Sequence, residues 1–127
     1  MDVSYQSIST EVGVIAPKRT AVYLDSFTQS YDKLILTGEL NSLWCEKKVE
    51  NYKWYKYELT FNRVRKYTAI EIDEYYHTQD THTPSVFCEK VQSAEIKNSF
   101  KTFVFETYDW AYIVECADHK FTVTGYR

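Results

Sequence analysis

Glycine and proline are scarce in this chain, with three glycines and two prolines among 127 residues. Three isolated glycines cannot build a GxGxxG or a Walker loop, so loops that cradle phosphate are excluded. No apolar stretch approaches the roughly 20 residues that a helix needs to cross a bilayer. The sequence does not begin with a basic region followed by an apolar segment, so we expect no export signal and no membrane partner.

Cysteine and histidine are also sparse, with three residues of each type. Cys45, Cys88 and Cys116 lie far apart and form no CxxC motif. Their odd number leaves at least one thiol unpaired, so we expect reduced thiols and a cytoplasmic protein. His77 and His82 are five residues apart, a spacing that suits neither a helical nor a strand pair of metal ligands. We therefore expect no metal and no cofactor.

Groupings of residues that could carry catalysis are weak. Cys88 with His82 is the only local pair that could supply a thiolate and a base. Asp73 and Glu74 are adjacent, and neighbours on a strand point to opposite faces of a sheet. The two carboxylates could not then share acid–base work. We expect a protein that is not an enzyme.

Aromatic residues, in contrast, are plentiful: 12 Tyr, 7 Phe and 3 Trp make up 17% of the chain. Such residues favour pleated sheet over helix. In residues 52–64, Tyr55, Tyr57, Leu59 and Phe61 alternate with polar residues, which predicts a strand with one buried face. Similar patterns predict further strands at residues 3–8, 21–27, 33–45, 67–73, 102–108, 110–117 and 120–124.

These strands predict one all-β domain over residues 1–127. An antiparallel meander of this size must close as a small barrel or form a two-layer sandwich to bury its apolar faces. We expect Gly38 to mark a bulge or bend, and Asp118 with His119 to form the turn of the last hairpin. Residues 91–98 permit one short helix, and a helix packed over the sheet would give the alternative, an α+β fold.

Charge is distributed unevenly along the chain, whose net charge is −3. Residues 1–43 carry three basic and five acidic groups, residues 44–67 carry seven and three, and residues 68–127 carry five and ten. Carboxylates beside tyrosines suit the capture of a basic protein, because charge steers the encounter and tyrosine supplies contact area. The candidate partner-binding residues are Glu71, Asp73, Glu74, Tyr75, Tyr76, His77 and Asp80.

The basic middle segment interleaves cations with aromatic residues, as single-stranded nucleic-acid platforms do. Alternation, however, places Tyr55 and Tyr57 on the core face and Lys56 beside Glu58 on the other, so the two sets point apart. A nucleic-acid-binding domain remains an alternative, and so does a barrel that encloses a small apolar ligand. The candidate nucleic-acid-binding residues are Lys47, Lys48, Lys53, Lys56, Arg63 and Arg65.

Three stretches carry a resemblance to known proteins: WYKYELTFNRVRKY at 54–67, SVFCEKVQS at 85–93 and FVFETYDWAYIV at 103–114. Over residues 34–124 the chain resembles small uncharacterised bacterial β-rich single-domain proteins. Some of these are encoded beside polymorphic or contact-dependent toxins as immunity proteins. The resemblance implies a bacterial toxin-immunity or inhibitor protein that binds and occludes a basic partner, and it assigns no functional residue.

Overall fold

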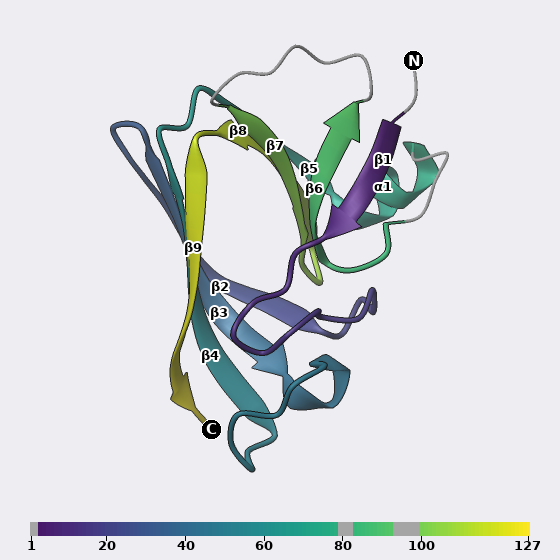
Figure 1. Ribbon diagram of the computed structural model, residues 1–127, viewed down its shortest axis with the longest axis vertical. Helices are drawn as coiled ribbons and strands as arrows, with labels where there is room; N and C mark the ends of the chain where they lie inside the picture. The colour runs from purple at the N-terminus through teal and green to yellow at the C-terminus, as the bar shows by residue number, and fades with distance from the viewer. Residues whose placement is uncertain (1–2, 79–82, 93–99) are drawn as a thin grey trace.

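The computed structural model describes residues 3–78, 83–92 and 100–127, and this part of the chain is mostly β-strand (Figure 1). Its elements, in order, are β1 (Val3–Ser7), β2 (Val22–Ser30), β3 (Lys33–Asn41), the 3₁₀ helix η1 (Ser42–Trp44), β4 (Trp54–Asn62), β5 (Lys66–Glu71), α1 (Ile72–Thr78), β6 (Phe87–Gln92), β7 (Lys101–Glu106), β8 (Trp110–Cys116) and β9 (Asp118–Tyr126). None of the described helices has the length and apolar character to span a membrane.

Two antiparallel sheets pack together, which confirms the expected all-β sandwich. The first sheet has the strand order β1-β6-β7-β8-β5, and the second has the order β2-β3-β4-β9. The described strands do not close into a barrel. In Figure 1 the chain crosses from β8 in one sheet to β9 in the other, and β9 then runs down to the C terminus.

The core between the sheets is aromatic. The strand predicted from the alternation in residues 52–64 is confirmed as β4, with its side chains Tyr55, Tyr57, Leu59 and Phe61 buried. The Tyr57 ring meets Phe105 of the first sheet edge-on, at 5.7 Å between ring centroids. Burying each such side chain contributes on the order of 1.5–3 kcal/mol, so ring packing across the two layers is a major stabilising contact of the sandwich.

The expected turn at Asp118 and His119 is wrong, because both residues belong to β9. Strand β8 already has neighbours on both edges, β7 and β5, so no edge remains for β9 to pair with. The chain bends at Ala117 and β9 pairs with β4, with His119 opposite Phe61. His119 thus lies against the aromatic core, 4.7 Å from the Phe103 ring, and burial lowers the pKa of its imidazole.

Strand β5 ends earlier than expected, and a helix follows it. The prediction that residues 67–73 form one strand is wrong at Ile72 and Asp73, which begin α1. The Glu71 carboxylate accepts the Glu74 backbone N–H at 3.0 Å, an N-cap bond that favours the helix, and Ile72 N–H donates to the Asp109 carbonyl at 2.9 Å. Buried Ile72 packs α1 onto the outer face of the first sheet.

The short helix expected at residues 91–98 is wrong at its start. Val91 and Gln92 belong to β6, where they pair with Ser4 and Val3 of β1. The remainder of the expected helix, residues 93–98, lies outside the described residues. Within the described residues the fold contains one short α-helix, and this helix is α1.

Gly38 lies opposite an irregularity in β2, which confirms that the backbone departs from a regular ladder here. The register shifts between Leu24 and Ser26, which face Gly38 and Thr37. A Cβ atom at position 38 would lie 1.9 Å from the Tyr23 carbonyl oxygen. The backbones of β2 and β3 therefore approach so closely that a side chain has no room.

We predict that Gly38→Ala lowers the free energy of unfolding by about 1–3 kcal/mol, because the added methyl group must push the Tyr23 backbone away. Urea denaturation measures this loss. Gly125→Ala is the matched control, since a Cβ there meets the Lys56 side chain at an ordinary 3.5 Å. Equal stability losses in the two variants would contradict the close approach at Gly38.

Candidate functional site

The turn between β7 and β8 is held in place by both sheets and by α1. Within the turn, the Thr107 N–H donates to the Trp110 carbonyl at 2.8 Å. The Tyr108 N–H donates to the Val22 carbonyl of β2 at 2.8 Å, and the Asp109 carbonyl accepts the first N–H of α1. These backbone bonds fix the positions of the side chains that the turn and the helix present.

The predicted partner-binding residues lie on and beside α1. Glu71, Asp73, Glu74, Tyr76 and His77 are exposed, whereas Tyr75 is buried against the sheet and cannot present its ring to a partner. Asp80 lies outside the described residues. Five of the seven predicted residues are therefore accessible on or beside α1.

Sequence reasoning missed the residues that complete this surface. The turn adds exposed Tyr108 and Asp109 beside the helix, and exposed Trp110, the first residue of β8, pairs with Glu71. We call the exposed set the helix–turn surface; its members are Glu71, Asp73, Glu74, Tyr76, His77, Tyr108, Asp109 and Trp110. Asp109, the single residue between the strands predicted at 102–108 and 110–117, was the available signal for the turn.

Arg19, from the segment before β2, was also missed, and it reaches both parts of the helix–turn surface. Its Nη1 lies 2.8 Å from the Asp73 Oδ1, and its Nε donates to the Tyr108 carbonyl at 3.2 Å. The guanidinium also lies over the Tyr108 ring, 4.8 Å from its centroid. The helix–turn surface has four carboxylates, and Arg19 is the cation paired with one of them, Asp73. The surface therefore keeps a net negative charge.

A buried polar cluster lies beneath α1, on the outer face of the first sheet. Thr83 donates its hydroxyl proton to the carboxylate of Glu106, whose residue is 4% exposed. Burial raises the pKa of Glu106, and the hydrogen bond from Thr83 opposes this shift. Burial raises the pKa of the Tyr75 hydroxyl and the nearby Glu106 carboxylate raises it further, and this hydroxyl has no hydrogen-bond partner among the described residues.

The cysteine thiols are buried and protonated rather than activated. Cys88 donates to the Ser85 carbonyl at 3.1 Å, and burial raises the pKa of its thiol. Burial likewise raises the pKa of Cys45 to about 11 and of Cys116 to about 12. His82, the base paired with Cys88 in the sequence, lies outside the described residues. Among the described residues, no three histidine, cysteine, aspartate or glutamate side chains gather as a metal site.

The structure does not bring the candidate nucleic-acid-binding residues together. Lys47, Lys48 and Lys53 precede β4, whereas Arg63 and Arg65 follow it. A nine-residue strand is about 26 Å long, so the two groups lie at opposite ends of the sandwich. The sixth residue, Lys56, is exposed within β4 itself.

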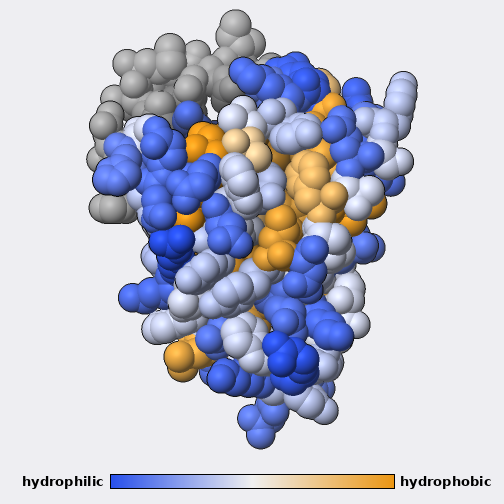
Figure 2. All heavy atoms as spheres, turned by 180° about the vertical axis from the view of Figure 1, so that it is seen from behind, coloured by the Kyte–Doolittle hydropathy of each residue, from blue (hydrophilic) through white to orange (hydrophobic). Residues whose placement is uncertain are grey.

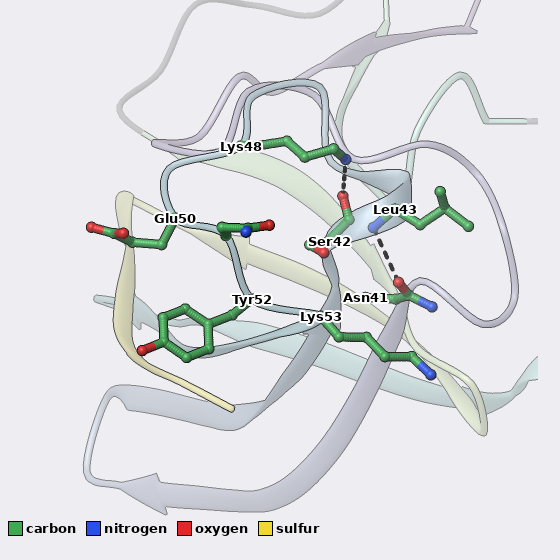
Figure 3. Close-up of a pocket in the computed structure, with 8 residues that line it drawn as sticks. Asn41, Ser42, Leu43, Lys48, Glu50, Tyr52 and Lys53 are labelled. Carbon is green, nitrogen blue, oxygen red and sulfur yellow. Dashed lines mark hydrogen bonds between the residues drawn. The ribbon is translucent and has the colours of Figure 1, made fainter.

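A shallow hollow of about 580 Å³ lies beside η1 and the loop that follows (Figure 3). The Lys48 ammonium donates to the Ser42 carbonyl, and the Asn41 side chain accepts the Leu43 N–H at 3.1 Å. Lys48 is thus engaged within its own loop. Most of the residues that line the hollow are exposed, and the buried one, Ser42, already bonds through its N–H to Lys53 and through its carbonyl to Lys48, so the hollow is not a preformed ligand site.

The surface of the molecule is mostly polar on the face shown in Figure 2, with an apolar patch in its upper half. Comparison of the chain with protein-family models, with curated proteins and with solved structures found no match. The chemistry of the described residues is therefore the basis on which function is inferred. Among the features described above, the helix–turn surface combines exposed aromatic rings, a net negative charge and a backbone held in place by hydrogen bonds.

We predict that Glu106→Gln becomes more stable relative to the wild type as pH rises. Below the ordinary carboxyl pKa, Glu106 is protonated in both the folded and the unfolded chain. At higher pH the unfolded chain loses this proton first, so the free energy of unfolding of the wild type falls until the pH passes the raised pKa of Glu106. Glutamine cannot ionise and escapes this loss.

Urea unfolding at a series of pH values measures the difference between the two proteins. Glu58→Gln is the control, because it removes a carboxylate from the exposed face of β4. A difference between Glu106→Gln and the wild type that stays flat or shrinks with rising pH would contradict the burial of an ionisable Glu106.

Proposed function

We propose that this chain is a non-enzymatic protein-binding module that captures a basic partner through the helix–turn surface. The exposure of three aromatic residues among carboxylates carries the proposal: Tyr76, Tyr108 and Trp110 are 39%, 37% and 41% exposed. Tyrosine and tryptophan contribute most of the binding energy in many interfaces. Acidic groups around them steer a basic partner and exclude acidic ones.

In its most concrete form, the module is a bacterial toxin-immunity or inhibitor protein of the cytoplasm. It acts by occlusion, covering the functional surface of its partner. The resemblance to immunity proteins supports this form, and the three buried free thiols suit a reducing compartment. Catalysis is not needed, because a stable complex is enough to block the partner.

The rigidity of the helix–turn surface supports tight binding. Its turn is bonded to β2 through Tyr108 and to α1 through Asp109. The Tyr108 ring also stacks on Tyr23, at 5.2 Å between centroids. A surface that is ordered before binding loses less conformational entropy in the complex, so more of the contact energy appears as affinity.

In the proposed immunity role, the partner is the toxin encoded by the reading frame next to this chain's own gene. We predict that Asp73→Lys with Glu74→Lys slows association with that protein by about tenfold at low salt, because the charge that attracts a basic partner is reversed. The effect shrinks as salt screens the charges. Biolayer interferometry at low and high ionic strength measures the association rate constant.

The control variant is Asp25→Lys with Glu58→Lys, which makes the same change in net charge at exposed positions on β2 and β4. Its association rate is expected to stay within about twofold of the wild type. Absence of binding by the wild type would contradict the immunity role. An equal loss in both variants would contradict the assignment to the helix–turn surface.

A further inference from the structure

The Arg19 guanidinium makes three kinds of contact at the helix–turn surface. It pairs with the Asp73 carboxylate, donates to the Tyr108 backbone carbonyl and lies over the Tyr108 ring. These are an ion pair, a directed hydrogen bond and a cation–π contact. Together they recognise the charge, the donor geometry and the planarity of a guanidinium.

The groups around Arg19 are positioned by contacts that do not involve Arg19. Tyr108 is held by its N–H bond to Val22 and by stacking on Tyr23. Asp73 lies in the first turn of α1, which is anchored by the bond from Ile72 to Asp109. Removal of the Arg19 side chain therefore leaves the carboxylate, the carbonyl and the ring in place.

The carboxylate of this ion pair is also the one most accessible to a competitor. The Asp73 side chain is 58% exposed, whereas the carboxylates of the other ion pairs between described residues are 19–31% exposed. Arg127 shows the contrast: it binds Glu39 through two nitrogens, and its backbone exchanges two hydrogen bonds with Trp54. Exposed ion pairs contribute little to stability, and an incoming guanidinium can re-form the bond to the Tyr108 carbonyl and the contact with its ring, so Arg19 can be displaced at small net cost.

We propose that Asp73 and Tyr108 form an arginine-binding site that Arg19 occupies in the free protein, and that an arginine side chain of the basic partner takes its place. The inference rests on the proposed function and specifies the partner's chemistry. Lysine fits the site less well, because an ammonium is a point charge that lacks a planar group to stack on the ring. The site thus selects arginine among basic residues.

Peptide titration tests the exchange. The probes are a blocked peptide of alternating arginine and glycine and its lysine counterpart of equal length, and the measurement is the dissociation constant from calorimetry. Arg19→Ala is expected to bind the arginine peptide about three- to tenfold more tightly than the wild type, because the internal competitor is gone. Adding Asp73→Asn to Arg19→Ala is expected to abolish the gain.

Lys33→Ala is the matched control, since it removes one positive charge at the other end of the β2–β3 pair. Lys33 pairs with Ser30, whereas Tyr108 bonds to Val22, so about 26 Å of strand separates the two positions. An equal gain in Lys33→Ala, an equal gain for the lysine peptide or no gain at all would overturn the arginine site. Thermal melting verifies that each variant is folded.

The two proposals fail in different ways. If charge reversal at Asp73 and Glu74 slows association with the natural partner but Arg19→Ala shows no arginine preference, the arginine site is wrong and the binding surface stands. If Arg19→Ala gains the preference but charge reversal leaves association with the natural partner unchanged, the arginine site exists and the proposed function is wrong.

Discussion

The rings of Tyr57 and Phe61 meet those of Phe87, Phe103 and Phe105 between the two sheets, and the rest of the structure depends on this contact. A strand whose side chains alternate can bury only one face, so the apolar faces of both sheets must turn toward each other. Aromatic rings are large and have preferred packing geometries, which fixes the separation and the register of the layers. The outer faces are then free to carry charge, a helix and exposed rings.

Connections beyond the core also hold the layers together, and the helix–turn surface depends on one of them. The chain itself passes from one sheet to the other between β1 and β2, between β4 and β5, and between β8 and β9. The β7–β8 turn makes a further connection, because Tyr108 bonds to Val22 of the second sheet. The same turn anchors α1 through Asp109, so the exposed tyrosines lie where strand, helix and opposite sheet meet.

The local sequence pattern predicted most of the strands, because the two-residue alternation of apolar and polar side chains can be read from neighbouring residues such as those of β4. The pattern failed where residues far away in the sequence determine where a strand ends or which strand it pairs with. The alternation of Ile70 and Ile72 suits a continuing strand, but the cap bond from Glu71 and the bond to Asp109 end the strand. Strand β9 could not be placed from its own residues, since its position depends on β8 having no free edge. For the same reason the acidic residues of the candidate site could be predicted, but their partner Arg19, 54 positions from Asp73, could not.

A row of rings links the exposed site to the second sheet, and its two ends differ in a way that sequence could not reveal. Tyr23 stacks on Tyr108 and meets Trp54 edge-on, and each outer ring carries an arginine. At the Trp54 end the arginine is Arg127, which backbone hydrogen bonds and two bonds to Glu39 hold in the sheet. At the Tyr108 end Arg19 is held by side-chain contacts that solvent reaches. The two ends share the same chemistry, and they differ in the backbone anchoring of Arg127 and in the exposure of the paired carboxylate, which is greater for Asp73 than for Glu39.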